Sequence, residues 1–134
     1  MAEGEIKSLA PQVDMSSFSF SESRYARGKK VWLAASLYKE AKDEGLEPFD
    51  MPLAGFDLSV MPFKCQNFDS FIWHMHRCMN CDTDIPVLLD DYGQVADGNH
   101  RIAKAILEGK RYIKAYRLKF MPPVDFIEEE VEEK

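Results

Sequence analysis

Hydrophobic residues recur at helical spacing in three stretches of the chain. Residues 29–45 carry a broad apolar face that ends at Gly45, a residue type that often stops a helix. Residues 99–110 place Ile102, Ala105 and Ile106 inward and have Gly109 as the stop. In residues 68–80 the large apolar positions fall at i, i+3, i+4, i+7 and i+11. These are Phe68, Phe71, Ile72, Met75 and Met79. The spacing predicts three helices.

Between these stretches the pattern changes to that of strands. Residues 49–60 alternate and contain Pro52, which is typical of an edge strand. Residues 85–98 predict a hairpin, with "PVLL" as a buried strand, "DDYG" as the turn and "QVA" as the return. Residues 111–118 alternate as a further strand. Residues 1–23 look irregular, with Phe18 and Phe20 as candidate anchors. This order of elements predicts an α+β fold.

Charge is concentrated at the end of the chain. Of the net charge of −6 over 134 residues, residues 125–134 hold six acids and one lysine, so they carry −5. We expect this acidic tail to be disordered. The nearly neutral remainder has no broad positive field for non-specific DNA binding, although "RYARGKK" (24–30) is either a solvated stretch or a local phosphate-binding patch. No signal peptide or apolar run of about 20 residues is visible, so we expect a cytoplasmic protein without a membrane partner.

The stretch "VADGNHRIAKAIL" (95–107) carries the candidate chemistry. The first N–H groups of a helix have no partner within the helix and attract anions. Gly98 allows close approach to the backbone, while His100, Arg101 and Lys104 supply donors and charge. Asp97 is open to three interpretations: helix cap, metal ligand or proton acceptor. Ordinary capping is the competing explanation, with Arg101 paired to Asp90 or Asp91.

A second group of candidate ligands, "HMHRCMNC" (74–81), is weaker. His74, Cys78 and Cys81 share one helix face, but His76 points elsewhere and no distant fourth ligand is evident, so we expect no zinc. Reactive CxxC pairs lie at helix N-termini, whereas Cys78 falls near a C-terminus. The three cysteines of the chain are therefore expected to be free thiols.

The segment "IPVLLDDYGQVADGNHRIAKAILEGKRYIKAYRL" (85–118) resembles the core of ParB-like domains of the ParB/sulfiredoxin fold, in particular small stand-alone bacterial members. The resemblance implies a small mixed sheet packed against about three helices. It divides the chain into an irregular segment (1–24), a ParB-like domain (25–120) and an acidic tail (121–134). It also implies that the loop and helix start bind nucleotide phosphates. The expected contacts are Gly98, Asn99, His100, Arg101 and Lys104.

Members of this fold differ at the motif, and the differences narrow the expectation. Sulfiredoxins have a catalytic cysteine where this chain has Asn99, so sulfinic-acid repair is not expected. ParB-like serine kinases use an aspartate as base, which Asp97 matches, while Asn99 and His100 depart from their pattern. Partition ParB proteins bind CTP through residues matching Gly98 and Arg101, but read DNA with a helix-turn-helix domain that does not follow the core here.

Two functional hypotheses result. The first is a ParB-like protein that binds ATP or another nucleotide, or a phosphorylated small molecule, with Mg²⁺; it leaves open weak phosphotransfer or NTP hydrolysis with Asp97 as the catalytic residue. The second is a non-enzymatic regulatory or interaction module that acts on DNA or on a DNA-bound partner.

Overall fold

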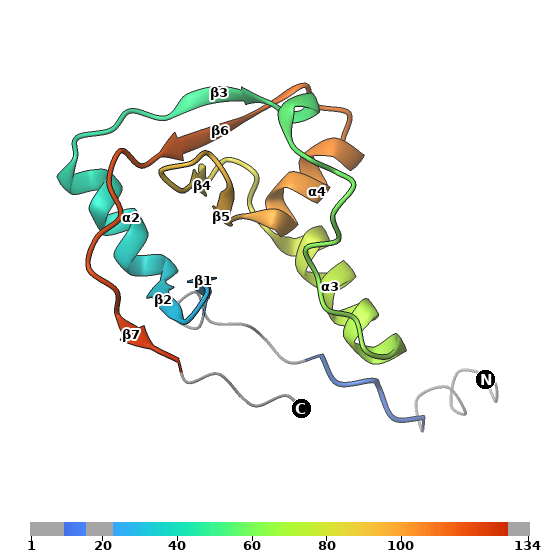
Figure 1. Ribbon diagram of the computed structural model, residues 1–134. Coiled ribbons are helices and arrows are strands. Elements are labelled where there is room, and N and C mark those ends of the chain that lie inside the picture. Colours follow the sequence, from blue (N-terminus) through green and yellow to red (C-terminus); the bar gives the residue numbers. More distant parts are fainter. Residues whose placement is uncertain (1–9, 16–22, 129–134) are drawn as a thin grey trace.

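The computed structural model describes residues 10–15 and 23–128, which form three α-helices and two small sheets (Figure 1). The mixed α+β class predicted from the sequence is confirmed. The elements are β1 (Arg24–Arg27), β2 (Lys30–Leu33), α2 (Ala34–Asp43), β3 (Phe49–Pro52), a 3₁₀ turn (Leu53–Gly55), α3 (Phe68–Asn80), β4 (Val87–Leu89), β5 (Val95–Asp97), α4 (Asn99–Leu107), β6 (Tyr112–Arg117) and β7 (Phe126–Ile127). No helix among the described residues is both long and apolar enough to cross a membrane.

The larger sheet has the strand order β3-β6-β4-β5. The predicted hairpin is present as β4 and β5, and α4 then returns the chain so that β6 lies parallel to β4. All three residues of β4 are buried, because α4 packs on the side of Val87 and Leu89 while α2 packs on the side of Leu88. This arrangement places the end of β5 and the start of α4 at one edge of the core (Figure 1).

The smaller sheet, with the order β1-β2-β7, corrects the predicted start of the first helix. The helix predicted over residues 29–45 begins only at Ala34, because residues 30–33 form the central strand of this sheet. Residues 24–27, which begin the stretch interpreted from the sequence as either solvated or phosphate-binding, form its edge strand, and Arg24 is exposed there. The helix prediction fails because Gly28, at φ 63°, turns the chain so that residues 24–27 pair with 30–33, and apolar spacing alone does not detect this hairpin.

The C-terminal segment is ordered as far as Glu128, so the prediction of a disordered tail from residue 121 is wrong for 121–128. Trp32 Nε1 donates to the Pro122 carbonyl at 2.8 Å, and β7 pairs with β2. The carboxylate of Asp125 accepts from Leu33 N at 2.8 Å and from Ser36 Oγ at 3.0 Å. This distant aspartate therefore caps α2, which has no local capping side chain. Residues 129–134 lie outside the described part, as do Phe18 and Phe20.

Helix α3 has the predicted bounds, and Asn67 and Ser70 form a capping box at its start. Its orientation differs from the usual inward-facing arrangement of an apolar face. Cys78 is its buried residue, and the large apolar side chains face solvent. The residues predicted to point inward from α4 are buried at Ile102 and Ala105, but Ile106 is 37% exposed. The predicted strand over 49–60 ends at Pro52, where the 3₁₀ turn begins.

Candidate functional site at the start of α4

The turn from β5 into α4 depends on Gly98, the N-cap residue. Its backbone has φ 118° and ψ 17°, a region that favours glycine. A Cβ atom there would lie 2.5 Å from Val87 Cγ1, so only glycine fits the turn as it is built. No side chain caps α4, because Asp97 is the last residue of β5 and its carboxylate is used elsewhere. The first turn of α4 therefore presents backbone N–H groups that lack a capping side chain.

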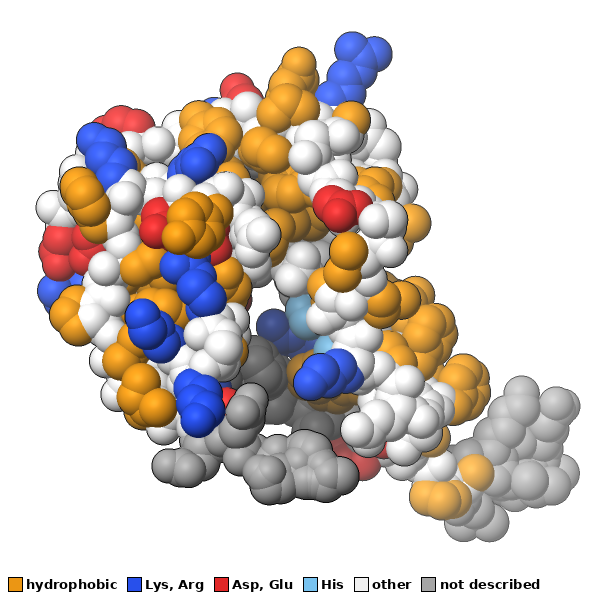
Figure 2. Space-filling view, viewed as in Figure 1, with side chains coloured by type: hydrophobic (Ala, Val, Ile, Leu, Met, Phe, Trp, Pro, Cys, Tyr) orange, Lys and Arg blue, Asp and Glu red, His pale blue; other side chains and the backbone are white. Residues whose placement is uncertain are grey.

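A cavity of about 690 Å³ lies against this turn. Its lining comes from the α4 start, from the C-terminal part of α3 and from the beginning of β1. Three arginines are among the lining residues, against two aspartates: Arg24, Arg77 and Arg101, with Asp82 and Asp97. Figure 2 shows a hollow near the centre of the view, with blue and pale-blue side chains inside it. The described lining thus carries a formal excess of positive charge beside a helix N-terminus, a combination suited to an anion.

Arg101 does not lie on the surface of the first turn. It is 9% exposed, and its guanidinium donates to the Ile85 and Pro86 carbonyls at 3.0 and 2.8 Å. The other terminal nitrogen donates to Asp97 at 2.7 Å and to the Tyr38 hydroxyl at 3.0 Å. Arg101 is thus buried together with Ile102 and Ala105, whereas the sequence predicted it only as a donor at the anion site. Its donors tie α4 to the segment before β4, which makes Arg101 a positioning residue of the junction.

Two side chains hold the Asp97 carboxylate. Besides Arg101, it accepts a hydrogen bond from Ser23 Oγ at 2.7 Å; the Tyr38 hydroxyl lies 3.1 Å away, but its single proton has a closer acceptor in the Pro86 carbonyl at 2.8 Å. Burial raises the pKa of the Tyr38 hydroxyl, and the neighbouring Asp97 carboxylate adds to that rise. The Asp97 side chain is 13% exposed. Its oxygens are thus occupied by donors of the protein itself, as in a carboxylate that fixes structure.

His100 lies in a stack of rings that sequence reasoning missed. Its Nε2 atom lies 2.9 Å from Nδ1 of His74, and the Phe63 ring stacks on both imidazoles at 4.5 and 4.8 Å. Burial, followed by the positive charge of Arg77, lowers the pKa of His100 to about 4, and burial also lowers the pKa of His74. Both rings are therefore neutral near pH 7. No local signal could reveal this pair, because its members are 26 positions apart.

The other residues of the two candidate motifs fall into separate places. Asn99 lines the cavity, whereas Lys104 is not among the lining residues and its Nζ donates to the Cys81 carbonyl at 2.8 Å. Burial raises the pKa of the Cys78 and Cys81 thiols, so both are unreactive as thiolates. All three cysteines are free. Among the described residues, no three or more His, Cys, Asp or Glu side chains are grouped to hold a metal ion.

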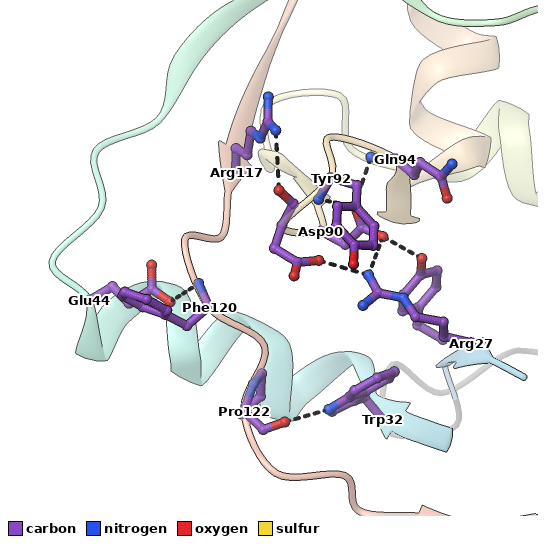
Figure 3. Close-up of polar contacts among 11 residues, drawn as sticks. Arg27, Trp32, Glu44, Asp90, Tyr92, Gln94, Arg117, Phe120 and Pro122 are labelled. Atoms are coloured by element: carbon purple, nitrogen blue, oxygen red, sulfur yellow. Dashed lines mark hydrogen bonds and ion pairs between the residues drawn. The ribbon is translucent and has the colours of Figure 1, made fainter. Parts of the chain in front are cut away.

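The acidic turn after β4 binds Arg27 of β1 rather than Arg101. Arg27 donates to Asp90 at 2.7 Å and to Asp91 at 2.8 Å, and Asp90 also accepts from Tyr25 and from the backbone of Tyr92 and Gln94 (Figure 3). Burial alone would raise the pKa of Asp90, but these hydrogen bonds outweigh it and lower the pKa. The suggested pairing of Arg101 with either acid is therefore not formed, and Arg27 is committed to the fold.

Comparison with protein-family models, curated proteins and solved structures found no match for this chain. The functional argument consequently rests on the geometry of the α4 start and on the motif within residues 95–107.

Proposed function

We propose that the protein binds a small phosphate-bearing anion, with a nucleotide as the leading candidate, in the cavity at the start of α4. The observation that carries the proposal is the uncapped first turn of α4, which borders a cavity of about 690 Å³ that Arg24 and Arg77 also line. The resemblance of residues 85–118 to ParB-like domains supports a nucleotide. The size of the cavity suits a ligand of that class.

The proposed roles of the motif residues differ from those expected from the sequence. The backbone N–H groups that follow Gly98, together with the Asn99 side chain, are the proposed phosphate contacts. Arg24 and Arg77 supply positive charge from β1 and α3, whereas His100 is neutral and its Nε2 is paired with His74. Arg101 positions the turn, and Lys104 lies outside the proposed contacts. The proposal is binding rather than turnover, because both Asp97 oxygens already accept hydrogen bonds, Oδ1 from Ser23 and Oδ2 from Arg101.

A substitution at Asn99 tests this proposal with opposite effects on stability and on binding. Asn99→Asp adds a negative charge to the first turn of α4, which stabilises the helix by about 0.3–1 kcal/mol. The same charge repels a phosphate held there and weakens binding about tenfold. Asn67→Asp is the matched control, since it makes the same change at the N-cap of α3, outside the cavity lining, where Asp caps as well as Asn.

Thermal shift and calorimetry with ATP, CTP, GTP and inorganic phosphate, each with and without Mg²⁺, provide the measurement. A ligand at 100 times its Kd stabilises the folded state by about 2.7 kcal/mol, which raises Tm by several degrees. We expect one or more nucleotides to raise the Tm of the wild type and of Asn67→Asp, and to bind Asn99→Asp more weakly. The absence of any response to every nucleotide overturns the proposal and favours the interaction module.

A further inference from the structure

Helix α3 carries an unusual row of exposed apolar side chains, here called the α3 stripe. Phe68 and Met79 are 74% and 70% exposed, and Phe71, Ile72 and Met75 are 47%, 37% and 41% exposed. Figure 2 shows orange side chains gathered along the right-hand side, where Figure 1 places α3. Cys78, the buried residue of the helix, follows Phe71 by seven positions and borders the stripe, while the face opposite the stripe, with the half-buried Ser70, His74 and Arg77, packs on the protein. Helix α3 is therefore amphipathic, but its more apolar face is exposed to solvent instead of packing on the core.

The size of the stripe is that of a functional apolar patch. Taking roughly 200 Å² for a large side chain in full exposure, the exposed fractions of its five members amount to about 500 Å². This value lies in the upper half of the range of about 300–600 Å² for the largest apolar patch of a typical monomer, and such patches are often functional. The smallest specific protein interfaces bury about 500 Å² on each partner, so the stripe alone reaches that threshold.

The spacing of the stripe indicates what covers it. Its four best-aligned members, Phe68, Ile72, Met75 and Met79, are separated by four, three and four positions. This spacing reads the same in both directions along the helix. A second copy running antiparallel across a two-fold axis therefore places Phe68 against Met79 and Ile72 against Met75, so that apolar meets apolar along the whole row. Antiparallel packing also sets the two helix dipoles in opposite directions, which is favourable.

We propose that the protein forms a homodimer through antiparallel pairing of the α3 stripe with that of a second copy. Polar residues bound the stripe on one side: Asp69, His76 and Asn80 are exposed and form the rim expected around an apolar interface. The inference does not rest on a ligand in the α4 cavity, because none of the five stripe residues lines that cavity, although the rim residues His76 and Asn80 do.

Sedimentation velocity over a range of protein concentrations tests the dimer. Met75→Lys puts a charge in the middle of the stripe, and we expect the dimer dissociation constant to rise at least about thirtyfold. Phe120→Lys is the control, because Phe120 is a comparably exposed (67%) apolar residue in the loop after β6 and lies outside α3. It should dimerise as the wild type does. Circular dichroism verifies that both variants are folded, as expected for changes at exposed positions.

The antiparallel register has its own test. Ile72→Glu should also be monomeric alone, but an equimolar mixture of the Ile72→Glu and Met75→Lys proteins should regain the dimer, because the introduced charges of opposite sign then face each other. A wild type that stays monomeric at the highest concentrations overturns the proposal, and so does a Met75→Lys protein that dimerises as the wild type does. A monomeric wild type that binds phosphatidylcholine vesicles through the stripe would assign the surface to lipid instead, and would equally overturn it.

Discussion

Replacing Arg101 by alanine tests whether this residue belongs to the interior. The change removes four hydrogen bonds of 2.7–3.0 Å and leaves the Asp97 carboxylate, 13% exposed, without its positive partner. Breaking a buried ion pair from one side costs about 3–5 kcal/mol. Asp97 keeps the Ser23 hydroxyl as a donor and has the Tyr38 hydroxyl within 3.1 Å, so we expect the lower end, about 3 kcal/mol. That loss lowers Tm by about 10 °C in a domain of this size.

Urea unfolding of a double-mutant cycle measures this effect. Asp97→Ala alone should also destabilise, but the double variant should lose at least about 1 kcal/mol less than the two single losses together, because neither charge is then left unpaired. Arg24→Ala is the matched control from the same cavity: Arg24 is exposed and its guanidinium lies 5.0 Å from the centre of the Phe126 ring. Arg24→Ala should lower the free energy of unfolding by less than about 1 kcal/mol.

The outcome that contradicts this reasoning is simple to recognise. If Arg101→Ala unfolds within about 0.5 kcal/mol of the wild type, the residue behaves as a surface side chain. An accompanying loss of nucleotide affinity would then return Arg101 to the role of a phosphate clamp, and Asp97 would have to be reconsidered as a free carboxylate.

Three further predictions concern the glycine at the start of α4, the titration of His100 and the contacts of the C-terminal segment. Gly98→Ala should destabilise by about 3 kcal/mol, because its Cβ meets a core side chain at 2.5 Å, whereas Gly28→Ala, also at positive φ but with open space around it, should lose about 1 kcal/mol in urea unfolding. The pKa of His100 falls from 6.5 to about 4 on folding, so as the pH is lowered the unfolded chain is protonated before the folded one. The contribution of neutral His100 to stability is therefore complete above about pH 6.5 and declines toward pH 4. In His100→Gln the urea midpoint should fall less steeply over this pH range. A chain shortened to residues 1–124 should lose at least about 2 kcal/mol, since it lacks the cap of α2 and strand β7, while one ending at residue 128 should melt near the full-length Tm.

The elements that the sequence predicts well are those whose determinants are local. The bounds of α3 follow from apolar spacing, and the β4–β5 hairpin follows from a buried run, a turn and a short return strand. The first turn of the predicted helix over 29–45 fails because apolar spacing was weighed alone: Val31 and Trp32 favour a strand, the turn at Gly28 pairs them with β1, and only the second partner, β7, is distant in the sequence. The periodicity of α3 locates its stripe but carries no information on whether that face meets core or solvent.

In the candidate site, too, the features with local determinants were predictable and those that depend on distant residues were not. Gly98 was recognisable as a turn residue, since the need for positive φ is encoded by the residue type itself. The place of Arg101 was not, because its guanidinium reaches the carbonyls of Ile85 and Pro86, which precede it by 16 and 15 positions. The pairing of His74 with His100 depends in the same way on how α3 packs on α4.

The placement of β7 against β2 has a kinetic consequence. Lys30 pairs with Ile127, so this part of the small sheet closes only when two distant regions of the chain meet, whereas β4, β5, α4 and β6 follow one another within residues 87–117. Pairing over long separations is slow, because loop-closure entropy must be overcome before any contact rewards it. The C-terminal strand β7 is therefore expected to pair late in folding and to detach early in unfolding. Its release frees the Leu33 amide from Asp125, so in native-state hydrogen exchange the entrance of α2 and the end of the chain should open as one unit, ahead of the β4–β6 ladder.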